Sequence, residues 1–142
     1  MYEIKTSCDK GKTFIFDFLR HRYVSLTPEE WVRQHFVHFL EEHKGYPAEL
    51  MANEIELRCG MKRLRCDSLL MDSLMQPRMI MEYKAPSIAL TQKVFSQISA
   101  YNMLLKVDYL IVSNGMQHYC CKMDYDKNTY HFLEDIPCYS DL

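Results

Sequence analysis

Hydrophobic and polar residues recur along this chain with periods that change at well-marked points. Apolar residues spaced three and four apart indicate an amphipathic helix, whereas a period of two, rich in β-branched and aromatic residues, indicates a strand. The pattern predicts helices at 28–43 and 89–106. It predicts strand segments at 13–26 (one or two strands), 51–59, 62–71, 78–84, 108–115, 117–124 and 129–135, the last two forming a closing hairpin.

Local chemistry sets the limits of the first helix. Thr27 is a favourable N-cap, Pro28 fits the first helical turn, and Glu30 occupies the position of a capping-box partner. Gly45 and Pro47 are residues that end a helix. The order of elements is therefore helix, three strands, helix, strand and hairpin, which predicts an α/β (α+β) fold on a mainly antiparallel sheet.

Length and composition narrow the class of protein. The chain has 142 residues, 48% of them hydrophobic and 25% charged, so we expect one globular domain spanning residues 1–142. No apolar run approaches the roughly 18 residues of a membrane span, and the first residues lack the apolar stretch of a signal peptide. We therefore expect a cytoplasmic protein without membrane contact.

The same expectation bears on the oxidation state of the six cysteines. In the cytoplasm they are expected to be reduced thiols, and no pair has the C-x-x-C spacing typical of zinc sites. A zinc site is therefore not expected.

The formal net charge of −2 at pH 7 bears on the partners of the protein. A stand-alone nucleic-acid-binding protein usually carries a basic surface, because contacts with phosphates dominate its affinity. Here basic residues cluster only locally, at 20–22 and 62–65. Charge alone argues against tight DNA binding by the isolated domain.

Two opposite charges inside the apolar strand 78–84 are the strongest chemical signal. Glu82 and Lys84 point to the same face of that strand, because side chains alternate along it. Burying them costs free energy unless each finds a partner or an ion. Asp67 lies on the preceding strand and would meet Glu82 if the two strands are neighbours. Two adjacent carboxylates repel each other, and magnesium or manganese, helped by the Tyr83 carbonyl, would remove that conflict.

Asp67 followed by Glu82-Tyr83-Lys84 resembles the D…(D/E)-x-K core of the PD-(D/E)xK nuclease superfamily. Gln97 and Tyr101, on the helix after it, resemble the Q-x-x-x-Y motif of a narrower group, the N-terminal nuclease domain of type I restriction enzyme R subunits and RecB-like nucleases. The segments TPEEWVRQHF, KRLRCD, EYKAP and YLIVSNG add to this resemblance, which covers roughly residues 13–138.

The resemblance implies a restriction-endonuclease-like core with a central mixed sheet flanked by helices. It implies a magnesium-dependent DNA endonuclease, with manganese as a substitute metal, that hydrolyses phosphodiester bonds. Asp67 and Glu82 would be metal ligands and Lys84 the catalytic lysine, while Gln97 and Tyr101 would line the site. Cys66 stands where the superfamily's name places a proline.

Two further sets of residues complete the expected site. Many members of the superfamily supply another acid from the first helix, and Glu30 is preferred here over Glu42 and Glu54. Arg63 and Arg65 are candidates for contacts with the DNA backbone, since a guanidinium presents a fork of donors to phosphate.

Less specific readings stay open for the same residues. Glu82 and Lys84 would form a surface ion pair on a half-exposed sheet, Gln97 and Tyr101 would only bridge helix and sheet, and the arginines would line a solvated face. At the level of the whole chain, the alternative is a noncatalytic nucleic-acid-binding or assembly module that keeps the nuclease fold.

The expected partners follow from the enzyme reading. DNA is the substrate, and a homodimer would allow cleavage of both strands. No G-x-x-x-x-G-K-[ST] motif occurs in this sequence, so a motor or specificity protein would be a separate partner.

Overall fold

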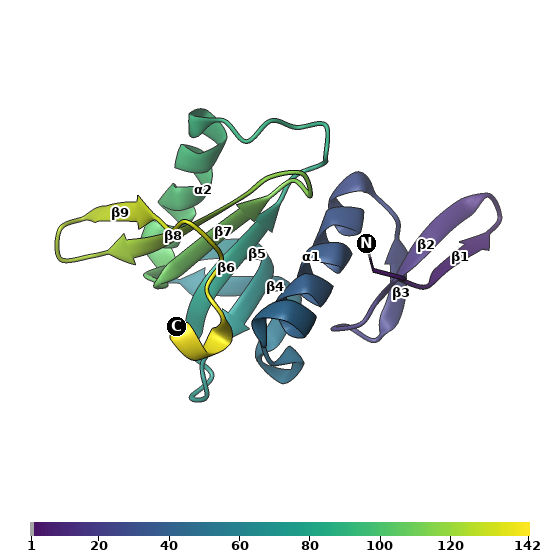
Figure 1. Cartoon of the computed structure of the whole chain (residues 1–142), viewed down its shortest axis with the longest axis horizontal. Coiled ribbons are helices and arrows are strands. Elements are labelled where there is room, and N and C mark those ends of the chain that lie inside the picture. The colour runs from purple at the N-terminus through teal and green to yellow at the C-terminus, as the bar shows by residue number, and fades with distance from the viewer. Residues whose placement is uncertain (1) are drawn as a thin grey trace.

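The structure, a computed structural model, describes the backbone of residues 2–142. It describes the side chains of the same residues, apart from those of residue 59 and of residues 101–104. Figure 1 shows the arrangement of its elements. In chain order these are β1 (Thr6–Asp9), β2 (Lys12–Asp17), β3 (Arg22–Ser25), α1 (Pro28–Lys44), a 3-10 turn (Ala48–Leu50), β4 (Met51–Cys59), β5 (Lys62–Met71), β6 (Pro77–Tyr83), α2 (Gln92–Leu105), β7 (Tyr109–Ser113), β8 (His118–Asp124), β9 (Thr129–Phe132) and a 3-10 turn (Tyr139–Asp141).

The main sheet is mixed, as the family resemblance implied, and mainly antiparallel, as the pattern predicted. Its strands are hydrogen-bonded in the order β4-β5-β6-β7-β8-β9. The pair β6–β7 is parallel and the other pairs are antiparallel. A parallel pair needs a long crossover, and α2 supplies it.

The two helices pack on opposite faces of this sheet. Successive residues of β6 face different helices. Met79 and Met81 lie in the core beneath α1, whereas Ile80 lies in the core beneath α2. The neighbouring residues Cys120 and Cys121 of β8 also face opposite cores, as their adjacent positions require. The cysteines whose side chains are described are free thiols.

Helix α1 begins and ends at the predicted signals. The Thr27 hydroxyl accepts a hydrogen bond from the Glu30 backbone amide at 3.1 Å, and Pro28 opens the first turn. Gly45 adopts the left-handed conformation (φ 72°), which favours glycine, and the Tyr46 amide then donates to the Leu40 carbonyl at 3.1 Å.

Helix α2 begins later than the predicted residue 89. Residues 85–91 form a loop, in which the Asn114 side chain donates to the Ile88 carbonyl at 2.8 Å. The Thr91 hydroxyl accepts from the Val94 amide at 3.3 Å and so acts as the N-cap. A tertiary contact and a local cap therefore set the start of this helix.

A second, three-stranded antiparallel sheet, β1-β2-β3, precedes α1 and projects to the side of it away from the main sheet (Figure 1). The sequence predicted one or two strands within 13–26 and missed β1. All four residues of β1 are exposed, so no hydrophobic alternation marks that strand. Within the described residues, no helix is long and apolar enough to cross a membrane.

Candidate active site

The charged end of β6 has the predicted orientation. Met81 and Tyr83 are buried beneath α1, while Glu82 and Lys84 are only partly buried. Glu82 is the cross-strand neighbour of Val112, which lies in the core beneath α2. Glu82 therefore belongs to the face of the sheet that α2 covers.

Asp67 meets Glu82 across the neighbouring strands β5 and β6. Ser68 pairs with Met81 in this antiparallel ladder, so Asp67 stands next to Glu82 one position further along. The backbone amide of Tyr83 donates a hydrogen bond of 2.9 Å to Asp67 Oδ2. The three residues that the motif singled out, Asp67, Glu82 and Lys84, are thus gathered at one end of the sheet.

The electrostatics of the pair show the conflict expected of two close carboxylates. Burial, and then the charge of Asp67 and a hydrogen bond with it, raise the pKa of Glu82 to about 9, although the positive charge of Lys84 acts in the opposite direction. The pKa of the Cys66 thiol is raised to about 12 by burial and by the same two carboxylates. The pair therefore favours either a shared proton or a cation.

The donor set fits magnesium. Within the described part of the chain, no three His, Cys, Asp or Glu side chains gather closely enough to hold a metal by themselves. Magnesium, however, is commonly bound by one or two carboxylates, with waters and substrate phosphates completing its octahedron. Asp67 and Glu82 supply two such groups, and the Tyr83 carbonyl stays the predicted third ligand.

Arg33, on α1, is a site residue that the sequence analysis missed. It is 5% exposed, and it donates to the Asp67 carbonyl at 3.2 Å and to Glu54 Oε1 at 2.6 Å. Its guanidinium also lies 5.9 Å from the centre of the Tyr83 ring. A signal was present, because Arg33 lies one helical turn before Val37 on the apolar side of the helix.

Glu30 is buried and fully engaged by partners. Arg20 donates to Oε1 at 3.0 Å, while Gln34 donates to Oε2 at 3.0 Å and Arg33 lies 3.3 Å from the same oxygen. A role as the additional metal ligand stays a prediction, and it would require these partners to move.

Glu54, on β4, bridges two arginines, since Arg33 and Arg65 bind its two oxygens at 2.6 and 3.0 Å. Burial alone would raise the pKa of Glu54, but the hydrogen bond from Arg33 and the charges of the arginines hold it below the usual value. Glu54 also has a left-handed backbone (φ 55°), a strained conformation for a non-glycine residue within a strand.

The structure places the two candidate arginines and Gln97 at the surface. Arg65 and Arg63 are exposed on β5, with Arg63 3.7 Å from Glu56. Gln97 is exposed on α2. The side chain of Tyr101 lies outside the described residues, so the roles of Gln97 and Tyr101 stay predictions.

A second polar network connects β2 with β4 and β5. Asp17 is fully buried, and both of its carboxylate oxygens accept hydrogen bonds of 3.1 Å from the Asn53 side chain. It also forms an ion pair with Arg20. Asn53 in turn accepts from the Ser68 hydroxyl at 2.5 Å. Ser68 directly follows Asp67, so this network links the N-terminal sheet to β5, the strand that carries Asp67.

A mixed sheet covered by a helix on each face, with paired carboxylates and a lysine at one end, is the arrangement of restriction-endonuclease-like α/β domains. The chain belongs to the family of the type I restriction enzyme R protein N terminus, whose profile matches residues 28–137. No curated protein matches the sequence.

Among solved structures, the chain is similar to a fragment described as an HsdR subunit of a type I restriction enzyme from Vibrio vulnificus YJ016. The TM-score is 0.54 at 19% sequence identity, and the match covers 79% of this chain and 24% of that chain. At this identity the likeness concerns the fold. The chain thus spans about a quarter of the length of that fragment.

Proposed function

We propose that this domain is a magnesium-dependent deoxyribonuclease that hydrolyses phosphodiester bonds in DNA. The observation that supports it best is the pairing of Asp67 with Glu82, beside Lys84, at one end of the sheet. The raised pKa of Glu82 fits a site that is incomplete without a cation, because a divalent ion would remove the repulsion that burial intensifies.

In this proposal Asp67 and Glu82 hold the metal, and a bound magnesium supplies Lewis-acid polarisation of the phosphate and an activated water. Lys84 orients that water or stabilises the charge that develops on the phosphate oxygens. Arg33 fixes Asp67 through its carbonyl. Arg63 and Arg65 steady the DNA backbone, and Gln97 and Tyr101 support the site from α2.

The test is nicking of supercoiled plasmid in magnesium and in manganese, with Lys84→Ala purified in parallel. We expect wild type to nick in either metal but not in EDTA, and Lys84→Ala to lose roughly a hundredfold or more of that activity. Lys127→Ala is the matched control, because Lys127 is exposed in the β8–β9 turn. Equal nicking by wild type and Lys84→Ala would contradict the proposal.

A noncatalytic DNA-binding or assembly module is the second candidate, and the net charge of −2 favours its assembly form, because a negative domain binds phosphates weakly. Metal binding separates the two functions. For the nuclease, manganese at ten times its Kd would stabilise wild type by about 1.4 kcal/mol, a Tm increase of roughly 4 °C, and would not stabilise Asp67→Ala. No shift in either protein, together with no nicking, would favour the module.

A further inference from the structure

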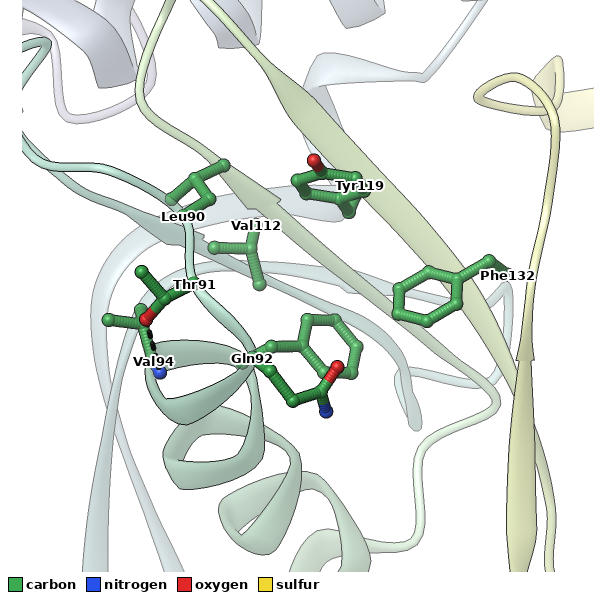
Figure 2. Close-up of a pocket in the computed structure, with 8 residues that line it drawn as sticks. Leu90, Thr91, Gln92, Val94, Val112, Tyr119 and Phe132 are labelled. Atoms are coloured by element: carbon green, nitrogen blue, oxygen red, sulfur yellow. Dashed lines mark hydrogen bonds between the residues drawn. The ribbon is translucent and has the colours of Figure 1, made fainter.

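A cavity of about 280 Å³ lies between the start of α2 and strands β7, β8 and β9. Figure 2 shows the side chains around it, with Tyr119 and Phe132 facing the space above the helix and Gln92 extending toward Phe132. We call it the aromatic cavity; its lining residues are Leu90, Thr91, Gln92, Val94, Phe95, Val112, Tyr119 and Phe132.

Large aromatic side chains stay partly open to solvent here. Tyr119 is 40% and Phe132 is 49% exposed, and their ring centres are 6.0 Å apart at an interplanar angle of 68°. Phe95, which is buried, lies 4.9 Å from Phe132. Single exposed apolar residues are ordinary on a protein surface, but these two converge on one concave site.

The aromatic cavity lies beside the paired carboxylates. Glu82 of β6 pairs with Val112 of β7, and Val112 pairs with Tyr119 of β8. The three residues therefore form one row across the sheet, on the face that α2 covers. Adjacent strands are about 4.8 Å apart, so the Tyr119 backbone is roughly 10 Å from that of Glu82. One DNA strand can reach both.

The lining residues suit an uncharged, flat ligand. All eight are uncharged, and polar groups come from Thr91, Gln92 and the Tyr119 hydroxyl. Within the part of the chain that the structure describes, the amide nitrogen of Gln92 makes two long hydrogen bonds, of 3.3 Å to Ser96 and 3.4 Å to the Tyr130 hydroxyl. A nucleobase offers a π-face to the aromatic rings and polar edges to such groups.

We propose that the aromatic cavity binds an unpaired nucleobase of the DNA strand whose phosphate lies at Asp67 and Glu82. The inference rests on the proposed function, and it specifies the substrate as single-stranded, or locally unpaired, DNA. A base within a duplex does not expose its face, so only an unpaired base stacks on Tyr119 and Phe132.

The experiment compares two labelled strands of equal length, oligothymidylate and a strand of abasic sugars, by fluorescence anisotropy in calcium without magnesium or manganese. Both carry the same phosphates, so the ratio of their Kd values reports contact with the bases. We expect wild type to bind the thymidylate strand roughly tenfold more tightly, and the double variant Tyr119→Leu, Phe132→Leu to lose that preference.

Each single variant is also measured, so that a folding defect in the double variant does not remove the test. Tyr23→Leu is the matched control, because Tyr23 is 45% exposed on β3, within the N-terminal sheet. The dependence of Kd on salt is expected to stay unchanged in the double variant, since no phosphate contact is lost.

Three outcomes would overturn the inference: equal binding of both strands by wild type, no binding of either strand, or an unchanged preference in the variants. An apolar side chain of a partner protein would then be the better occupant. Nicking that depends on Lys84 is measured separately. The proposed nuclease activity can therefore be supported even when base binding by the aromatic cavity is contradicted. A base preference lost in the variants of a protein that does not nick DNA would support the cavity alone.

Discussion

Arg33 is the residue whose replacement tests how the site is held together. Its guanidinium lies among the carboxylates of Glu30 and Glu54 and donates to the Asp67 carbonyl. Arg33→Met leaves Glu30 with Arg20 and Glu54 with Arg65 as the remaining cationic partner, so we expect a loss of about 2–3 kcal/mol in the free energy of unfolding, measured by urea denaturation. Arg58→Met, at an exposed position on β4, is the control and should stay within about 0.5 kcal/mol of wild type. Equal stability of the two variants would show that the network contributes little.

Asp17 gives stability a defined pH dependence. Burial alone would raise its pKa, but hydrogen bonds from the Arg20 backbone and side chain and from Asn53, with the charge of Arg20, hold the pKa below the usual value. A carboxyl whose folded pKa is lowered adds stability above its unfolded pKa, and that stability is lost as the pH falls through the folded pKa. Asp17→Asn should therefore cost about 2–3 kcal/mol near pH 7, and progressively less below about pH 4.

Urea denaturation across this pH range measures the effect of Asp17. The exposed residue Asp126, replaced by Asn, is the control. A difference between wild type and Asp17→Asn that stays constant from pH 7 to pH 3 would show that shape, and not charge, explains the loss.

At the residue scale, the sequence predicts those candidate site residues whose positions follow from a local pattern. Glu82 and Lys84 share a face because strand side chains alternate, and Asp67 follows once β5 and β6 are read as neighbours. The contacts of Arg33 with β5 and of Asp17 with β4 were missed because their partners are distant in the chain. The contact of Arg33 with Asp67 spans 34 residues and that of Asp17 with Asn53 spans 36.

At the element scale, the N-cap of α1 is a local stability determinant. Thr27 accepts the Glu30 amide, which has no partner within the helix. Thr27→Ala should destabilise the domain by about 1 kcal/mol, measured by thermal and urea denaturation. Ser87→Ala, exposed in the loop before α2, is the matched loss of a hydroxyl and should have little effect. An equal cost for both substitutions would contradict the capping role.

The elements that were predicted well are those with strong periodicity or clear caps. The first helix was predicted at 28–43 and found at 28–44, and the strands 51–59 and 62–71 agree with β4 and β5. The elements that differ depend on contacts that a local pattern does not contain. Polar, exposed β1 exists because its backbone pairs with β2, and α2 begins at Gln92 because Asn114 binds the loop before it.

At the scale of the whole molecule, the N-terminal sheet and the family core depend on each other. The matched family region begins at residue 28, yet Asp17 and Arg20 lie before it and bind Asn53 and Glu30 within it. Ile15 of β2 is fully buried as well. Removing residues 2–26 would leave polar groups of the core unpaired and open the surface beneath β2.

We therefore expect deletion of residues 2–26 to cost roughly 4–8 kcal/mol, of the order of the whole stability of a domain, and to leave the chain largely unfolded by circular dichroism. Deletion of residues 2–9 is the matched control, because all four residues of β1 are exposed and the buried groups of β2 remain. A cooperatively folded 27–142 fragment would contradict this dependence. It would also mean that β4 and β5 hold Asp67 in place without Asp17, so that the carboxylate pair belongs to the family core alone.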